Sequence, residues 1–169
     1  MRVGNHDWTS NRLMHSPLSI EFLGPYSWHG ASDAPSVFTA PVASTQGIYL
    51  WTIALPDGYI TYYVGETGRS FALRMAEHFQ EHAACMYTLY EPEQFARGTK
   101  VKLWPGRWGR EKRSIADCVS QSVVFAPQIA ATTQLFRFFL ATTTCDRRIR
   151  QRAESGIADC LYNTPGMIG

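Results

Sequence analysis

Hydrophobic and polar positions form their clearest pattern between residues 47 and 64. Two runs, Ile48–Leu55 and Tyr59–Val64, are rich in β-branched and aromatic residues, which favour strands. The tripeptide Pro-Asp-Gly at 56–58 separates them, and these residue types are typical of a tight turn. The pattern therefore predicts a β-hairpin.

The turn decides which side chains share a face of that hairpin. A three-residue Pro-Asp-Gly loop places Leu55 opposite Tyr59. Counting back along both strands then makes Tyr63 the neighbour of Tyr49 on one face. A two-residue Asp-Gly loop would shift the register by one residue and place Tyr62 beside Tyr49. Because proline favours the first position of a type I turn, we expect Tyr63 in that place.

A polar loop and a helix follow the hairpin. Ser70 suits the N-cap of the helix, which we expect to begin there. The expected buried stripe recurs every four residues and consists of Phe71, Met75, Phe79 and Ala83. Arg74, His78 and Glu81 lie on an adjoining face, because they are four and three residues apart. A cation and an imidazole therefore face whatever lies beside the hairpin.

These residues together resemble the GIY-YIG nuclease superfamily. The motifs are Gly47-Ile48-Tyr49, Tyr63-Val64-Gly65, and Arg74 with His78 four residues later. The resemblance spans about residues 46 to 163, and the segment 86–145 carries no motif of the family. It implies a site in which Tyr49 activates water, Arg74 neutralises charge on a phosphate, and Tyr63 and His78 orient water or phosphate.

The family also supplies a glutamate from a later helix as the metal ligand, and Glu154 matches it in this chain. Ile149, Ala153, Ile157 and Cys160 have helical spacing and place Glu154 beside an apolar stripe. Arg150 precedes Glu154 by four residues and could instead pair with it. Asn163 is a further candidate, and the fallback carboxylates are Glu21, Glu111 and Asp159.

The rest of the chain has weaker signals. Residues 1–45 contain four prolines and short apolar pieces at 18–23 and 37–38, so we expect an N-terminal extension of one or two strands or an extended arm packed on the core. By the resemblance, we expect residues 46–169 to form the GIY-YIG-like domain.

Within it, Ser122–Phe125 is expected to be a strand and Gln134–Ala141 a helix. The expected fold is α/β, a small mixed or antiparallel sheet with helices packed on its faces.

Composition indicates a globular chain, with 45% hydrophobic residues in 169 and a net charge of +2. The charge is uneven. The sequence has 16 basic and 14 acidic side chains, of which residues 1–68 hold two and five, so the remainder holds 14 and nine. The positive half carries the expected site, as a polyanionic substrate requires. No secretory leader or membrane-spanning apolar run is recognisable, so we expect a cytoplasmic protein without a membrane partner.

A basic and aromatic run at 100–113 is the expected nucleic-acid contact. Two tryptophans, Trp104 and Trp108, interrupt six basic residues, which are Lys100, Lys102, Arg107, Arg110, Lys112 and Arg113. Such a loop can hold phosphates while it stacks on bases. The alternative is a solvated loop that the tryptophans anchor to the core. The arginines at 147–152 are interpreted as a solvated helix face.

The sequence therefore predicts a metal-dependent DNA endonuclease that hydrolyses phosphodiester bonds with one Mg²⁺ or Mn²⁺ held by Glu154. Two alternatives stay open: a non-catalytic nucleic-acid-binding module of the same fold, and an interaction domain without a nucleic-acid role. No separate specificity domain is visible. Sequence preference would come from the basic loops, from a protein partner or from self-association.

Overall fold

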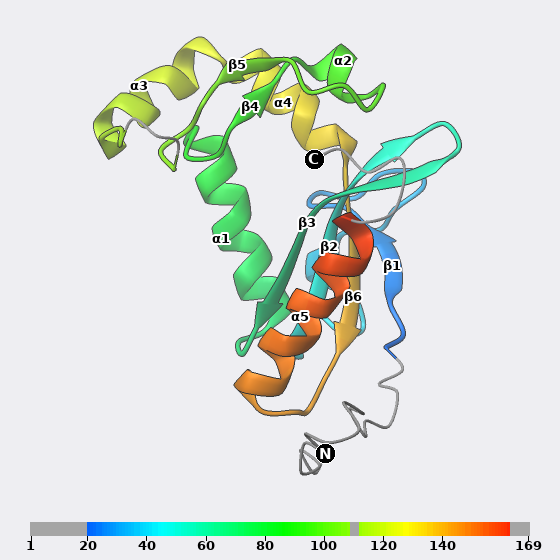
Figure 1. Cartoon of the computed structure of the whole chain (residues 1–169). Helices are drawn as coiled ribbons and strands as arrows, with labels where there is room; N and C mark the ends of the chain where they lie inside the picture. Colours follow the sequence, from blue (N-terminus) through cyan, green and yellow to red (C-terminus); the bar gives the residue numbers. More distant parts are fainter. Residues whose placement is uncertain (1–19, 109–111, 163–169) are drawn as a thin grey trace, which may run out of the picture.

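The computed structural model describes residues 20–108 and 112–162. Over these residues the protein has a mixed α/β fold, in which five α-helices pack on a four-stranded antiparallel sheet and a two-stranded sheet (Figure 1). The expected class, a small sheet with helices on its faces, is confirmed, and the sheet is antiparallel.

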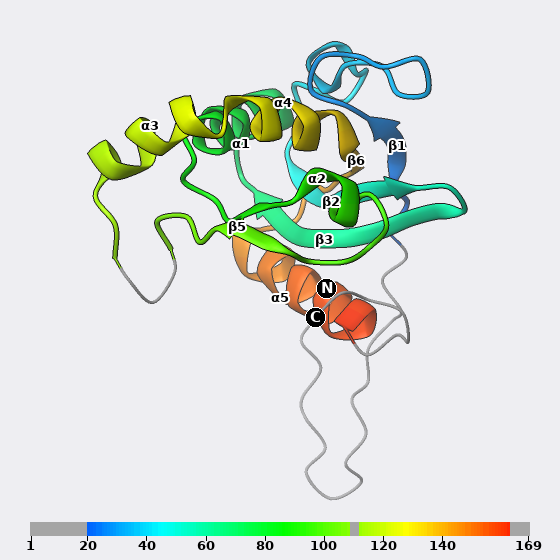
Figure 2. The same ribbon diagram turned by 90° about the horizontal axis from the view of Figure 1, so that it is seen from above.

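The four-stranded sheet has the order β1-β6-β2-β3. Its strands are β1 (Leu23–Tyr26), β6 (Phe136–Thr142), β2 (Gly47–Leu55) and β3 (Gly58–Thr67). Helix α5 (Arg147–Tyr162) lies on one face, while α1 (Phe71–Ala83) and α4 (Ala126–Leu135) lie on the other (Figure 2). Strand β3 is an edge strand. Near its end, Glu66 contacts Arg150 of α5, and the ring of Tyr63 lies near that of His78 of α1.

The remaining elements form a second, smaller layer beyond the end of α1. They are β4 (Leu89–Tyr90), α2 (Pro92–Phe95), β5 (Lys102–Trp104) and α3 (Ile115–Val124). Strands β4 and β5 pair antiparallel. A separate apolar cluster holds this layer together, with Cys85, Leu89, Trp104, Cys118 and Ile129 as its buried members.

The hairpin of β2 and β3 turns more tightly than expected. Leu55 pairs with Gly58, so the loop has two residues, 56 and 57. The predicted pairing of Leu55 with Tyr59 is therefore wrong, and Tyr59 lies opposite Ala54 instead. If nothing compensated for this change, every later pair of the hairpin would also slip by one residue.

A β-bulge restores the predicted register before the strands reach the candidate site. The register shifts after Trp51, where β3 has one more residue, Tyr62, than β2. Beyond the bulge, Trp51 lies opposite Tyr63, and Tyr49 lies opposite Gly65. Tyr63, and not Tyr62, is thus the neighbour of Tyr49, as expected, although the assumed turn was wrong.

Residues 20–45 contribute to the same core as the hairpin. Strand β1 pairs with β6, and Trp28 is only 2% exposed among the rings of Trp51, Phe136 and Phe138. The indole N–H of Trp28 donates to the backbone oxygen of Met75 at 3.1 Å. The apolar piece at 37–38 lies in the short 3-10 helix η1 (Val37–Thr39), not in a strand. A domain boundary near residue 45 stays a prediction.

Two elements expected between residues 120 and 141 are of the opposite type. Ser122–Phe125 belongs to the end of α3 and its C-cap, not to a strand. Gln134–Ala141 ends α4 and forms most of β6, which is a central strand and not a helix. A strand buried on both faces carries a continuous apolar run, which periodicity cannot distinguish from a buried helix. Only its pairing with β1 and β2 makes this segment a strand.

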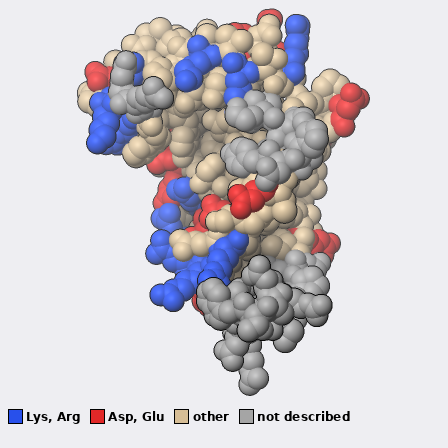
Figure 3. Space-filling view, in the orientation of Figure 1, with Lys and Arg blue, Asp and Glu red and all other residues tan. Residues whose placement is uncertain are grey.

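Basic side chains gather at two ends of the face drawn in Figure 3. One group lies where α5 begins, beside the start of α1, and the other lies over β5 and α2 and beside α3. Helix α5 is the longest described helix, with 16 residues that include four arginines. No helix within 20–108 or 112–162 has the length and apolar character to cross a bilayer.

Candidate active site

Tyr49 lies at the centre of the site, where β2 meets α1. Its side chain is fully buried, and its ring lies directly over Gly65 on β3. A Cβ atom at position 65 would come within 2.3 Å of the ring carbon Cζ of Tyr49. The glycine of the second tripeptide is therefore required by the tyrosine of the first. This contact explains in physical terms why the two motifs occur together.

Three predicted side chains surround the Tyr49 ring. The hydroxyl of Tyr49 lies 2.7 Å from Nε2 of His78, and Nε of Arg74 donates to it at 3.3 Å. The ring of Tyr63 lies 6.2 Å from that of Tyr49, centroid to centroid. The structure therefore brings together Tyr49, Tyr63, Arg74 and His78.

Helix α1 begins where Ser70 caps it, since the Ser70 hydroxyl accepts from the backbone N–H of Leu73. The predicted buried stripe is only half right. Phe71 and Met75 are buried, but Phe79 is 40% exposed and Ala83 is exposed. The buried face continues instead through His78 and His82. The buried face of the helix is therefore turned relative to the predicted stripe. A search for apolar residues could not show this, because histidine is polar and these two are buried with hydrogen-bond partners.

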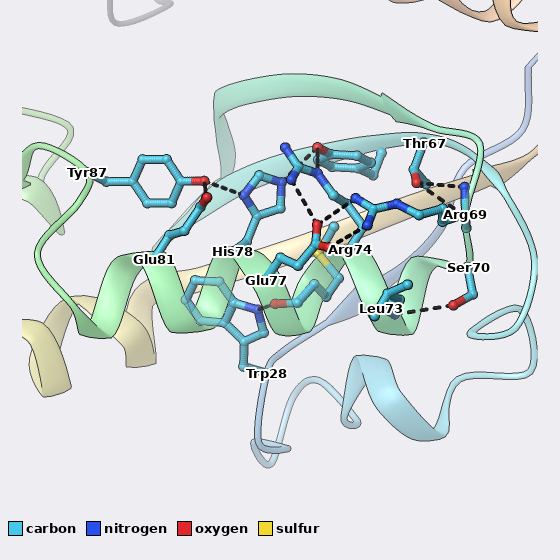
Figure 4. Close-up of polar contacts among 12 residues, drawn as sticks. Trp28, Thr67, Arg69, Ser70, Leu73, Arg74, Glu77, His78, Glu81 and Tyr87 are labelled. Atoms are coloured by element: carbon cyan, nitrogen blue, oxygen red, sulfur yellow. Dashed lines mark hydrogen bonds and ion pairs between the residues drawn. The ribbon is translucent and has the colours of Figure 1, made fainter. Parts of the chain in front are cut away.

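A chain of hydrogen bonds leads from Tyr49 through His78 to a carboxylate (Figure 4). The hydroxyl of Tyr87 donates to Oε2 of Glu81, so its oxygen accepts from Nδ1–H of His78 at 2.7 Å. With the proton on Nδ1, the Nε2 atom of His78 carries a lone pair and accepts from the Tyr49 hydroxyl. Every proton in the chain is thus directed toward Glu81.

Tyr87 is the member of this chain that sequence reasoning missed. It lies in the segment between α1 and β4, nine residues after His78 and without a motif around it. Glu81 was assigned to the same helix face as Arg74 and His78. A tyrosine in a loop carries no local signal that its hydroxyl returns to that helix, so only the fold reveals it.

Burial keeps both partners at the centre of the chain neutral. Burial raises the pKa of Tyr49 well above its normal value of about 10, and the hydrogen bond from Arg74 offsets only part of the rise. Burial, and then the charge of Arg74, lowers the pKa of His78 to about 3. At neutral pH the pair is therefore a phenol and a neutral imidazole.

Arg74 reaches the surface of the site and is held there by a carboxylate. Its Nη1 atom donates to Oε2 of Glu77 at 3.2 Å, and Arg69 donates to the same oxygen at 2.7 Å (Figure 4). The hydrogen bond from Arg69, and then that from Arg74, lowers the pKa of Glu77. The two arginines share a single carboxylate, which leaves local positive charge beside Tyr49.

Glu154 on α5 lies within electrostatic reach of the two tyrosines. Burial, and then the negative charge of Glu66, raises the pKa of Glu154. Burial is also the main cause of the raised pKa of Tyr63, and the charge of Glu154 adds to it. The alternative in which Arg150 pairs with Glu154 is wrong, because Arg150 pairs with Glu66 at 3.0 Å.

Among the described residues, no three His, Cys, Asp or Glu side chains cluster as metal ligands would. Ile149, Ala153 and Ile157 are half-buried as expected for the stripe of this helix, whereas Cys160 is exposed. The other candidates Asn163 and Glu111 lie outside the described residues.

A basic pocket of about 410 Å³ opens on the side of Arg74 that faces α5. Arg69, Arg74, Arg147 and Arg150 line it together with Glu66. The arginines at 147–152 were interpreted as a solvated helix face, which is wrong only for Arg150, since Arg147, Arg148 and Arg152 are exposed. Arg150 is buried against Glu66, and Arg147 shares this pocket with Arg74.

The predicted nucleic-acid loop has one anchoring and one exposed tryptophan. Trp104 is buried and donates its indole N–H to the backbone oxygen of Cys85, and Arg113 stacks over its ring at 4.5 Å. Trp108 is 68% exposed, with the Arg107 guanidinium 5.2 Å from its ring centroid. Trp104 therefore anchors the loop to the core as the alternative expected, and the nucleic-acid contact stays a prediction. Of its other basic residues, Lys102 and Lys112 are exposed, Lys100 is half-buried, and Arg110 lies outside the described residues.

Comparison with family models, with characterised proteins and with solved structures finds no match to this chain. The likeness to GIY-YIG nucleases therefore depends on the quoted motifs and on the contacts among their residues.

Proposed function

We propose that this protein is a metal-dependent DNA endonuclease that hydrolyses phosphodiester bonds in the site around Tyr49. One observation supports the proposal above all others. The Tyr49 hydroxyl is contacted by His78, which can accept a proton, and by Arg74, which is permanently charged. A buried core tyrosine needs only one hydrogen-bond partner. This pair is suited to moving a proton next to an anion.

Tyr49 acts as a proton relay in this proposal. A phenolate formed in advance is costly, because burial holds the pKa of Tyr49 above its normal value. The Tyr49 oxygen instead takes a proton from the attacking water while its own proton passes to Nε2 of His78. The water oxygen bonds to phosphorus as its proton leaves, and the bond from phosphorus to the leaving oxygen breaks with its electron pair on that oxygen. No free phenolate has to accumulate.

His78 needs support to hold that proton, since burial lowers its pKa to about 3. The Nδ1–H group donates to Tyr87, and Tyr87 donates to the Glu81 carboxylate. The positive charge that appears on His78 is therefore stabilised by a negative charge two hydrogen bonds away. Tyr87 and Glu81 act through His78 and do not touch the reacting atoms.

Arg74 binds the phosphate that is cleaved. Its planar guanidinium can offer two N–H groups to phosphate oxygens, and it neutralises charge that develops in the transition state. The basic pocket beside it, with Arg69 and Arg147, provides for the next phosphate along the strand. Glu77 fixes the orientation of both Arg69 and Arg74.

Glu154 is the residue that would hold Mg²⁺ or Mn²⁺. Its half-buried carboxylate is disfavoured as an anion by burial and by Glu66, and a divalent cation would relieve both effects. Mg²⁺ is commonly held by one or two carboxylates together with water and substrate phosphates, which fits a single glutamate. When bound, the cation would stabilise negative charge on the leaving oxygen.

The burial of Tyr49 also favours a second candidate, a module that binds nucleic acid without cutting it. A fully enclosed tyrosine with a raised pKa is what a core residue would show. In that case the arginines and the loop around Trp108 would be the working surface. This candidate predicts DNA binding that weakens with salt, without metal-dependent cleavage.

Nicking of supercoiled plasmid with and without Mg²⁺ or Mn²⁺ tests the proposal. Wild type should nick only with metal, and Arg74→Ala, Tyr49→Phe and Glu154→Ala should each lower the rate by about 100-fold or more. Arg97→Ala and Glu93→Ala change exposed charges that line neither pocket of the site, and both variants should retain the rate. Each variant is first checked for folding by circular dichroism.

The outcomes separate the candidates. Wild type that binds DNA but nicks neither plasmid, branched nor mismatched DNA would favour the non-catalytic module. Nicking that survives Glu154→Ala would mean that another carboxylate holds the metal, with Glu66 as the nearest choice. Arg74→Ala should lose nicking while it retains most of the affinity for DNA, because many other basic groups contribute to binding.

A further inference from the structure

We propose that an aromatic pocket beside Arg74 binds an unpaired nucleobase, so that the substrate carries an unpaired nucleotide next to the cleaved phosphodiester. The inference rests on the proposed function, because a phosphate at Arg74 is what brings the base to this pocket. It adds a substrate class to that function, namely DNA with a flap, a gap or an extruded base.

The pocket has a volume of about 430 Å³, within the usual range of about 300 to 1,000 Å³ for small-molecule sites. Its aromatic walls come from segments far apart in the sequence: Trp51, Tyr62, Tyr63, Tyr87 and Trp108. Every base has a π-face, and stacking on aromatic side chains is how proteins hold unpaired bases. The lining therefore suits a flat aromatic ligand of any sequence.

Arg74 connects this pocket to the rest of the site. It lines the aromatic pocket on one side and the basic pocket with Arg69 and Arg147 on the other. A phosphate on Arg74 would thus have a base-sized aromatic space next to it and a second phosphate site beyond it. That order suits one nucleotide strand, in which a base branches from the sugar between successive phosphates.

Trp108 shows that the pocket wall serves more than packing. Its neighbour in the same run, Trp104, is buried and anchors the loop. Trp108 has no such role, because it is 68% exposed while the Arg107 guanidinium lies over its ring. An indole that is open to solvent can serve as a stacking platform, and the adjacent guanidinium adds attraction for a phosphate.

The pocket also holds one carboxylate, which accepts hydrogen bonds. Glu81 lines it and accepts from the Tyr87 hydroxyl through Oε2, and a carboxylate can accept more than one hydrogen bond. A carboxylate accepts from the exocyclic amino group of cytosine and, by the same chemistry, from those of adenine and guanine.

A base inside a continuous duplex is paired and stacked, so it cannot enter a pocket of this kind. Enzymes that act on such a base take it out of the stack or use single-stranded substrates. The cost of extrusion is a few kcal/mol and is smallest for mismatched or already unpaired bases. The pocket should therefore select DNA in which that cost has already been removed.

Binding of 2-aminopurine oligonucleotides in metal-free buffer tests the inference, since cleavage does not then interfere. The fluorescent base is placed in a single-stranded flap, and in a matched continuous duplex. Wild type should bind the flap more tightly and quench its fluorescence by stacking. Trp108→Ala should weaken flap binding by about 5- to 100-fold, the range expected for the loss of one base–aromatic stack, and should relieve the quenching.

Tyr59→Ala is the matched control, because Tyr59 is an exposed aromatic residue that does not line the pocket. It should leave affinity and quenching unchanged. Equal affinity for flap and duplex, absent quenching at every flap position, or unchanged flap binding by Trp108→Ala would each overturn the inference. If continuous duplex is nicked with metal while no base is quenched, the endonuclease proposal is supported and the base-binding proposal is wrong. If bases are quenched but no DNA is nicked, the base-binding proposal is supported and the endonuclease proposal is wrong.

Discussion

Helix α1 buries two histidines one turn apart, and their surroundings differ. His78 is 2% exposed and His82 is 4% exposed, and burial lowers the pKa of both, to about 3 and about 4. His78 lies between the hydroxyls of Tyr49 and Tyr87. His82 lies 3.1 Å from Oγ1 of Thr132 and stacks on Trp28.

The difference lies in what the partners can do with a proton. Thr132 donates its hydroxyl hydrogen to backbone carbonyls of α4, so it can only accept from His82. The hydrogen bonds from His82 therefore lead only to buried backbone carbonyls of α4. The partners of His78 are phenols, and the chain connects Arg74 at a pocket to the Glu81 carboxylate. Burial and a shifted pKa are common to both histidines, so neither property identifies a site without a titratable partner.

The largest expected difference between the two histidines is in cleavage. His78→Ala removes the acceptor of the Tyr49 proton and should slow metal-dependent nicking by about 10²- to 10⁴-fold. His82→Ala should retain the nicking rate of the folded protein within a few-fold. It should instead lower the free energy of unfolding by about 1 to 3 kcal/mol, since it leaves a cavity and removes a buried hydrogen bond.

Nicking rates and urea denaturation of both variants provide the measurement. His82→Ala is the control for His78→Ala, because it removes the same side chain from the same buried helix face. Equal losses of cleavage in the two variants would contradict the comparison and would mean that α1 packing, not proton transfer, sets the rate.

The two histidines should behave alike in the pH dependence of stability. Each is neutral in the folded protein, whereas histidine in the unfolded chain titrates near pH 6.5. Between pH 6.5 and about 4 the unfolded chain binds more protons, so stability is full above this window and falls as the pH falls through it. Each histidine should cost about 2 kcal/mol of stability between pH 7 and pH 5.

Urea unfolding at pH 7, 6 and 5 measures this slope, above the range in which most carboxylates titrate. His82→Gln should remove its share of the slope. A slope that His82→Gln does not reduce would show that His82 is protonated in the folded state as well.

Sequence reasoning found the part of the site that short-range rules determine. The strand period placed Tyr49 on one face, and four-residue helical spacing placed Arg74 beside His78. Tyr63 was chosen from a turn that does not occur, and the bulge at Tyr62 corrected the error. The shorter turn and the bulge each shift the register by one residue, in opposite directions. The two shifts cancel before the strands reach Tyr49, so the pairing there agrees with the prediction.

The rest of the site depends on long-range contacts that no local pattern carries. Tyr87 reaches His78 from a loop, and Arg147 joins Arg74 from the start of α5. The segment 136–142 reads as a buried helix and becomes a central strand only by pairing on both sides. The same run is apolar in either structure, so neither propensity nor period could decide between them.

The smallest expected effect comes from the hydrogen bonds that link His78 to Tyr87 and Glu81. Tyr87→Phe removes the oxygen that accepts Nδ1–H of His78 but retains the ring that packs on Trp51. The proposal predicts a kcat for nicking about tenfold lower with KM nearly unchanged, because the charge on His78 loses its link to Glu81 while substrate contacts remain. The acid limb of the pH–rate profile should also move, since the loss alters how easily His78 takes a proton.

Tyr90→Phe is the matched control, because Tyr90 is a half-buried tyrosine that stacks on Phe95 and does not contact His78. It should leave kcat and the pH profile unchanged. If Tyr87→Phe also retained both, His78 would act through Tyr49 alone. The contrast with His82 would then depend on a single phenol and not on a chain of four residues. A loss that appears in KM instead would place Tyr87 in substrate binding, as a wall of the aromatic pocket.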